Sequence, residues 1–129
     1  MNIPDTLLYS KSHEWVKIEN NIATVGITDF AQQELSDIVN LELNDVGSEV
    51  ELDGEVGEIE AVKAASEIFS PVAGKIIEVN EKVLTSPEII NKDPYGEGWM
   101  FKIELTESLE DIQSRLMDSS RYKKFLEEE

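Results

Sequence analysis

Lys63 is the residue whose surroundings single it out for chemistry in this chain of 129 residues. No other Lys or Arg stands between Lys17 and Lys75, although that interval carries thirteen Asp and Glu residues. Its small neighbours Ala61, Ala64 and Ala65 leave room for a modifying enzyme to approach. A primary amine on a flexible stem is a target of covalent modification. The isolated lysine therefore predicts an attachment point that is recognised by its position.

Two short strands must position this lysine. Residues 57–62 alternate, with Ile59 and Ala61 on one face and glutamates on the other, as in a half-buried strand. The alternating pattern restarts at residues 74–80, so the chain reverses in between and places Lys63 at a turn. Composition alone favours a plainer alternative, in which an exposed turn lysine only aids solubility.

Other candidates for chemistry are few. The chain has one histidine, no cysteine, and neither of the glycine-rich phosphate-binding motifs, which removes most nucleophilic and nucleotide sites. His13 beside Glu14 is a candidate general base, so a hydrolase or lyase remains an alternative from another class. The acidic stretch 45–60 lacks the spacing of a calcium-binding loop, and no metal site is predicted.

Composition restricts the partners. The net charge of −17 disfavours nucleic acid and anionic membrane surfaces, because phosphates would repel the chain. No apolar run approaches the roughly 20 residues that span a bilayer, and the N-terminus resembles neither a signal nor a transit peptide. A cytoplasmic location is expected, with neither nucleic acid nor membrane as partner.

Short strands dominate the first hundred residues. Turn signals every 8–12 residues favour a sandwich or barrel. Thr28 and Ser108 are predicted helix N-caps, the first before a short helix and the second before a C-terminal helix with residues 109, 112, 116 and 117 on its apolar face. Prolines and glycines predict an irregular loop over 87–98. The predicted strands lie at residues 13–18, 21–27, 38–43, 48–52, 57–62, 74–80 and 99–105.

The segment EAVKAASEIFSPVAG resembles the lipoylation segment of the glycine cleavage system H protein family. The resemblance continues through YSKSHEWV, GITDFAQQELSDIV, EVNEKV and DPYGEGWMFKI, in the family's order and at about its spacing, and covers nearly the whole chain. Biotinyl domains differ, because they place Met on both sides of the lysine where this chain has Val62 and Ala64. Lipoyl domains of acyltransferases also differ, because they typically have Asp before the lysine where this chain has Val62.

The resemblance implies a mainly β fold, a barrel-sandwich hybrid of the lipoyl/biotinyl type. It implies a single lipoyl-carrier domain over residues 1–129, with a core of about 22–104, a short helix after the first hairpin and a C-terminal helical segment of about 107–126. Lys63 would lie at a hairpin tip.

The resemblance also implies a function, that of a non-catalytic carrier with lipoate in amide linkage on Lys63. The arm takes a methylamine group from glycine at the pyridoxal-phosphate glycine decarboxylase (P protein) and passes it to the aminomethyltransferase (T protein). Dihydrolipoyl dehydrogenase (L protein) reoxidises the arm, and a lipoate ligase or a lipoyl/octanoyl transferase attaches it. A carrier that relays octanoyl or lipoyl groups in lipoate metabolism is the alternative.

Family residues are carried over position by position. The loaded arm is expected in a cleft lined by Ser12, Glu14 and Glu67, whose carboxylates would hold a protonated amine. Ser36 stands where glycine is usual, and would cost about 1 kcal/mol if the backbone needs a positive φ there. Recognition of the attachment turn is expected to involve the flanking residues Glu60, Ala61, Val62 and Ala64.

Overall fold

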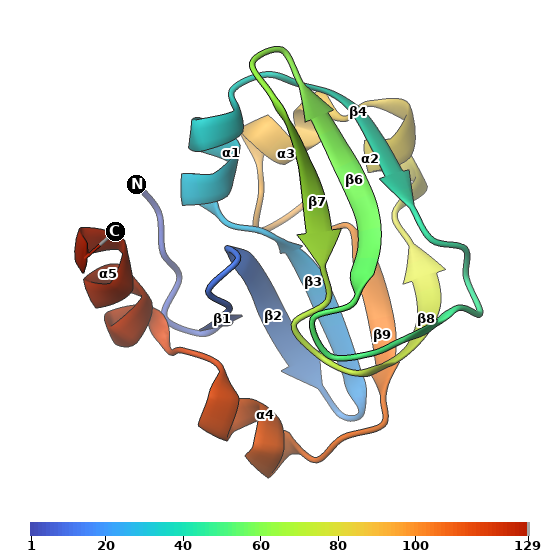
Figure 1. Ribbon diagram of the computed structural model, residues 1–129, viewed down its shortest axis with the longest axis vertical. Helices are drawn as coiled ribbons and strands as arrows, with labels where there is room; N and C mark the ends of the chain where they lie inside the picture. The colour runs from blue at the N-terminus through green and yellow to red at the C-terminus, as the bar shows by residue number, and fades with distance from the viewer. Residues whose placement is uncertain (129) are drawn as a thin grey trace.

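Two β-sheets form the body of the computed structural model, which describes residues 1–128 (Figure 1). The six-stranded sheet has the order β1–β2–β3–β9–β8–β5, and the three-stranded sheet has the order β4–β6–β7. This architecture confirms the predicted mainly β fold. The larger sheet consists of β1 (Leu8–Tyr9), β2 (Glu14–Glu19), β3 (Ile22–Ile27), β5 (Glu49–Val50), β8 (Gly74–Val79) and β9 (Phe101–Leu105). The smaller sheet consists of β4 (Ile38–Leu43), β6 (Glu55–Ala61) and β7 (Ala65–Phe69).

The two predicted hairpin strands at the N-terminus pair as β2 and β3, in antiparallel register from Glu14 opposite Ile27 to Glu19 opposite Ile22. The connection uses Asn20 with a φ of 57°, a left-handed conformation that Asn adopts more readily than most residues. Local alternation and turn chemistry are therefore sufficient to predict this hairpin.

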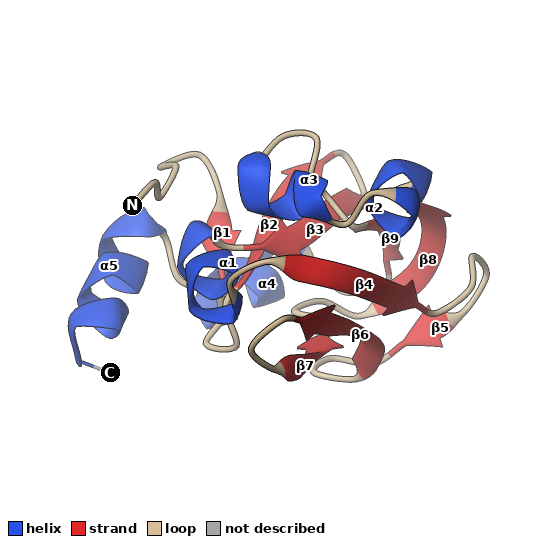
Figure 2. Ribbon diagram, turned by 90° about the horizontal axis from the view of Figure 1, so that it is seen from above, coloured by secondary structure: helices blue, strands red, loops and turns tan. Residues whose placement is uncertain are grey.

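The core lies between the inner faces of the two sheets (Figure 2). Ile59 and Ile68 of the smaller sheet are almost fully buried, as are Val25, Ile76 and Ile103 of the larger sheet. Burying each such side chain stabilises the fold by about 1.5–3 kcal/mol. The hairpin that carries Lys63 is thus anchored by its inner face, while its outer face stays free.

The capped helices form as predicted. Thr28 Oγ1 accepts a hydrogen bond from the Ala31 amide (3.2 Å) at the start of α1 (Asp29–Leu35). Ser108 Oγ accepts one from the Asp111 amide (3.1 Å) at the start of α4 (Leu109–Arg115). Each side chain satisfies a backbone donor that has no partner within the helix.

The C-terminal region departs from the prediction in two details. Leu109 was expected on the buried face of its helix but is half exposed, because it occupies the first position of α4 and lies outside the packed turn. The last helix, α5 (Ser119–Glu128), continues past the predicted end near residue 126. Its Tyr122 is fully buried and stacks on Tyr9, with ring centroids 4.6 Å apart. No helix within residues 1–128 has the length and apolar character needed to cross a bilayer.

Two further helices were missed by the sequence prediction. These are α2 (Glu81–Thr85) and α3 (Glu88–Lys92), and the second interrupts the segment expected to be an irregular loop. At five residues each, they are too short to show a helical period, and isolated helices of this length are unstable. Packing of the buried Val83 and Ile90 stabilises them instead.

Ser36, which stands where the family usually has glycine, adopts a positive φ. Its backbone lies at φ 68° and ψ −150°, a region that is essentially restricted to glycine. The Ser36→Gly variant is therefore expected to raise the free energy of unfolding by about 1 kcal/mol. Urea denaturation of the two proteins measures the difference. Destabilisation by the glycine would show that the side chain of Ser36 contributes more than its backbone strain costs.

Candidate functional site

Lys63 lies at the exposed tip of the β6–β7 hairpin, at the top of Figure 1. The turn is closed by a hydrogen bond from the Ala61 amide to the Ala64 carbonyl oxygen (2.8 Å). None of the residues between these two has a positive φ, so the turn needs no glycine. The predicted turn position of the lysine is thus correct, but the second strand was predicted wrongly. The partner of β6 is β7, which the sequence pattern missed, whereas residues 74–79 form β8 in the larger sheet. Covalent modification of the lysine stays a prediction.

The other turn residues divide by exposure. Ala61 is 7% exposed and points into the core, whereas Val62 is 71% exposed although it is apolar. Glu60 and Ala64 are also exposed. A modifying enzyme would therefore meet the side chains of Glu60, Val62 and Ala64 beside the lysine. Ala61, whose side chain is buried, can contribute only its backbone.

A buried carboxyl group lies near the other end of β7, where β2 begins. Glu14 is 2% exposed, and one of its carboxylate oxygens accepts hydrogen bonds from the hydroxyls of Ser10 (2.6 Å) and Ser12 (2.5 Å). The backbone amide of Phe69 also hydrogen-bonds to the carboxylate. The Ser10 amide also donates to the Glu14 carbonyl oxygen (2.9 Å), and the Glu14 amide donates to Ser10 Oγ (3.0 Å), which fixes the turn between them.

Burial raises the pKa of Glu14 from its ordinary value of 4.5 to about 7. Desolvation is the main cause, because removing a carboxylate from water disfavours its charged form. Hydrogen bonds from Ser10, Ser12 and Phe69 oppose that shift, and the nearby charge of Asp53 adds to it. Glu14 is therefore poised to gain or lose its proton near neutral pH, and a cation placed beside it would favour the charged form.

A pocket of about 490 Å³ opens beside this cluster. Its lining combines apolar side chains with hydroxyl and charged groups, which is the character expected for an aliphatic arm with a polar end. Lys11 and Arg115 contribute two cations to its rim. The pocket is lined by Tyr9, Ser10, Lys11, Ser12, Asp53, Phe69, Arg115, Leu116 and Met117.

The three residues predicted for the arm cleft do not all meet. Ser12 and Glu14 are hydrogen-bonded to each other, whereas Glu67 lies on β7, a strand of the other sheet. Glu67 and Phe69 are two residues apart on that strand, so both project from its outer face while Ile68 is buried between them. The outer face of β7 thus leads from the lysine turn towards the pocket.

Sequence reasoning missed two polar residues of this region, Ser10 and Asp53. Ser10 bonds directly to Glu14, and Asp53 lines the pocket with a left-handed backbone (φ 59°). Ser10 lies four residues before Glu14, and this spacing is only a weak sequence signal for the hydrogen bond between them. Nothing local predicts the second, because Asp53 reaches the site from the loop before β6.

The arrangement does not support a general-base pair of His13 and Glu14. His13 Nδ1 lies 2.9 Å from the hydroxyl of Tyr122 and its ring packs against Phe30, whereas the Glu14 carboxylate bonds the serine hydroxyls. The two adjacent side chains are engaged in separate clusters. The alternative of a hydrolase or lyase built on this pair is therefore not favoured.

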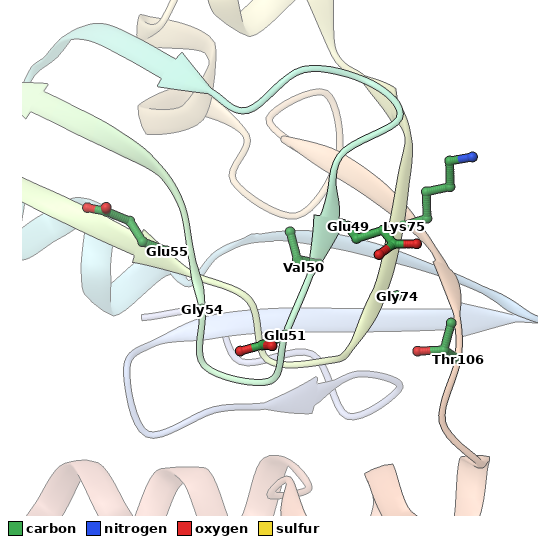
Figure 3. Close-up of a pocket in the computed structure, with 8 residues that line it drawn as sticks. All are labelled: Glu49, Val50, Glu51, Gly54, Glu55, Gly74, Lys75 and Thr106. Atoms are coloured by element: carbon green, nitrogen blue, oxygen red, sulfur yellow. The ribbon is translucent and has the colours of Figure 1, made fainter.

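A second hollow, of about 560 Å³, lies beside Gly54 and Glu55, where β6 begins (Figure 3). Its lining includes Glu49, Glu51, Glu55 and Lys75, and the side chains of Glu55 and Lys75 point away from each other in the figure. No group of three or more potential metal ligands occurs within residues 1–128. The carboxylates of this hollow therefore do not form a candidate metal cluster.

Comparison with known proteins gives one consistent result. The model of the glycine cleavage H-protein family matches residues 7–129. The glycine cleavage system H protein of Carboxydothermus hydrogenoformans is 49% identical over 127 residues, which is 98% of this chain and 96% of that protein. The mitochondrial glycine cleavage system H protein 2 of Arabidopsis thaliana is 52% identical over 123 residues, covering 95% and 78% of the two chains.

A solved structure agrees with this result. The crystal structure of a glycine cleavage system H protein from Mycobacterium marinum superposes with a TM-score of 0.87 at 33% identity, and covers 95% of this chain and 97% of that one. Together with the exposed lysine at the hairpin tip, the match over residues 7–129 places the chain in a family. The chain belongs to the glycine cleavage H-protein family.

Proposed function

We propose that this non-catalytic member of the glycine cleavage system carries lipoate in amide linkage on Lys63. On this proposal it shuttles the methylamine group of glycine from the decarboxylase (P protein) to the aminomethyltransferase (T protein). The observation that carries the proposal is the single lysine at the exposed tip of the β6–β7 hairpin, in a chain of this family. When attached, lipoate would supply a disulfide that accepts the methylamine group, and dihydrolipoyl dehydrogenase (L protein) would reoxidise the dithiol that remains after the group has been passed on.

The chain's own residues would hold the loaded arm rather than react with it. The apolar side chains that line the pocket, Phe69, Leu116 and Met117, would take the aliphatic part of the arm. Glu14 would accept hydrogen bonds from the protonated amine at the arm's end, and Ser12 would orient that carboxylate. The pocket would also shield the bound intermediate from water.

The outer face of the smaller sheet suits contact with cationic surfaces of partner enzymes. Glu42, Glu58 and Glu67 stand at directly paired positions across β4, β6 and β7, and none of them forms a salt bridge within residues 1–128. Like charges at paired positions destabilise a sheet. Basic residues of a partner would relieve that repulsion and steer its approach.

We place these encounters in the cytoplasm, together with the attachment of lipoate by a ligase or transferase.

Lipoylation in vitro tests the attachment site. After incubation with a lipoate ligase, ATP and lipoate, intact-mass measurement and peptide mapping are expected to find one lipoyl group, on Lys63 alone among the nine lysines. Modification spread over several lysines, or none in the folded protein, would contradict the proposal.

A second assay separates the two carrier roles. Glycine decarboxylation by the P protein is expected to depend on the lipoylated chain. If the chain is lipoylated on Lys63 but does not support decarboxylation, the relay of lipoyl or octanoyl groups replaces glycine cleavage as its function.

A further inference from the structure

The attachment turn is tied to the rest of the molecule by a hydrogen bond that does not belong to its own hairpin. The Val62 amide, next to Lys63, donates to the carbonyl oxygen of Asp37 (2.9 Å), just before β4. The adjacent register pair is Ile38 with Ala61. The position of the Asp37 carbonyl therefore influences the geometry of the turn.

Asn91 of α3 holds the backbone on both sides of Asp37. Its Nδ2 donates to the Ser36 carbonyl oxygen (2.8 Å) and to Gln32 Oε1 (3.0 Å). Its Oδ1 accepts a hydrogen bond from the Ile38 amide (3.0 Å). The side chain is thus engaged through both its donor and its acceptor groups, across more than fifty residues of sequence.

The bond from the Ile38 amide to Asn91 and the bond from the Val62 amide to Asp37 involve the same peptide unit. The Asp37 carbonyl and the Ile38 amide belong to the same peptide unit, and the described chain contains no cis peptide bonds. In a planar trans peptide the C=O and N–H groups point in opposite directions. When Asn91 fixes the direction of the Ile38 N–H, it also fixes the direction of the Asp37 C=O, which receives the Val62 amide.

We propose that Asn91 is a positioning residue for covalent modification of Lys63, which it influences through the Asp37–Ile38 peptide and the Val62 amide. The inference rests on the proposed attachment of lipoate to Lys63. Asn91 also stabilises the backbone of Ser36, the residue before Asp37, through a hydrogen bond to its carbonyl oxygen. Ser36 has the strained backbone described above, and such conformations persist only where the surroundings hold them.

The test compares Asn91→Ala with a matched variant, Asn80→Ala. Asn80, the N-cap of α2, also makes three side-chain hydrogen bonds: it donates to the carbonyl oxygens of Glu97 and Trp99 and accepts from the Lys82 amide. None of these bonds involves the turn. Both variants are assayed at a temperature where circular dichroism shows them folded. The two measurements are kcat/KM for lipoylation of Lys63 by the ligase and the hydrogen-exchange rate of the Val62 amide.

Asn91→Ala is expected to lower kcat/KM and to speed exchange of the Val62 amide by about tenfold each, the scale of one lost hydrogen bond. Asn80→Ala is expected to stay within about twofold of wild type in both, because distant sites act independently. Acetylation of Lys63 by a small N-hydroxysuccinimide ester, which reports only exposure of the amine, is expected to be unchanged in both variants.

Three results would overturn the inference while leaving the attachment site itself standing. These are a wild-type kcat/KM in Asn91→Ala, an equal loss in both variants, and a selective loss of kcat/KM without faster exchange at Val62. Failure of the wild-type protein to be modified on Lys63 is a different result. It would reject the proposed function, whatever the variants do.

Discussion

Replacing Lys63 by arginine is expected to abolish lipoylation and every activity that depends on it. Arginine keeps the positive charge and most of the stem length, but a guanidinium does not form the amide that an ε-amine forms with lipoate. The side chain is exposed and makes no salt bridge within residues 1–128, so the fold should be unaffected. Intact mass after incubation with ligase, ATP and lipoate measures the first effect. Glycine decarboxylation by the P protein measures the second.

Lys75→Arg is the matched control for this experiment. Lys75 is also exposed, and it lies on β8, away from the hairpin tip. The control protein should be lipoylated and should support decarboxylation as wild type does. Decarboxylation that continues at the wild-type rate with Lys63→Arg would mean that the chain acts without an arm on this residue, and would refute the mechanism.

Replacing Glu14 by glutamine is expected to change how stability depends on pH. The pKa of Glu14 is about 7 in the folded chain, against an ordinary value of 4.5. Between these two pH values the folded chain keeps the proton while the unfolded chain has released it. The stabilising contribution of the protonated group is therefore complete below pH 4.5 and is lost as the pH rises through 7.

The glutamine variant lacks this proton equilibrium. The difference in unfolding free energy between Glu14→Gln and wild type should shift in favour of the variant by about 3 kcal/mol between pH 4.5 and pH 8, from 1.4 kcal/mol per unit of pKa. Urea denaturation at a series of pH values measures it. The titrations of other carboxyl groups largely cancel in the difference, because both proteins contain them.

Glu19→Gln serves as the control, since Glu19 lies on the same strand but its side chain is exposed and pairs with Lys17 at the surface. It removes one solvated charge from a surface pair that contributes little to stability, and so it controls for the loss of a carboxylate from this strand. A flat difference for Glu14→Gln would show that Glu14 is ionised throughout this range in the folded protein.

The same titration bears on the proposed role of the pocket. A protonated amine beside Glu14 would favour the carboxylate and lower the pKa of Glu14. On the proposed function, loading of the arm near pH 7 would therefore release part of a proton from Glu14. The apolar surroundings that raise the pKa of the empty site would also strengthen the charge-assisted hydrogen bond in the loaded one.

Much of the fold follows from local patterns in the sequence. The period-2 alternation of residues 57–62 predicted a half-buried strand, and Ile59 and Ala61 do lie on its buried face. Thr28 and Ser108 predicted two helix starts, because a cap acts within three residues of itself. The isolation of Lys63 among acidic residues pointed to a special position, and the structure places it at the hairpin tip.

The resemblance to a family added what local patterns do not contain. It supplied lipoate, the partner enzymes and the pairing of Ser12 with Glu14 and Glu67. The structure joins the first two of these residues by a hydrogen bond and leaves Glu67 on a strand of the other sheet.

The exposure of Val62 and the burial of Ala61 depend on which face of β6 meets the core. The alternation of residues 57–62 had already indicated that face.

Only the tertiary structure decided the electrostatics of the site and the support of the turn. The pKa of Glu14 is raised by burial in the folded chain, and it is modified by groups far away in sequence: a hydrogen bond from Phe69 lowers it and the charge of Asp53 raises it. Asn91 reaches Ser36 across 55 residues, from a helix too short to be predicted. Sequence patterns contain information only about residues that are close in sequence, within one turn of a helix or one pleat of a strand. Desolvation and long-range hydrogen bonds exist only once the folded chain has brought distant segments together.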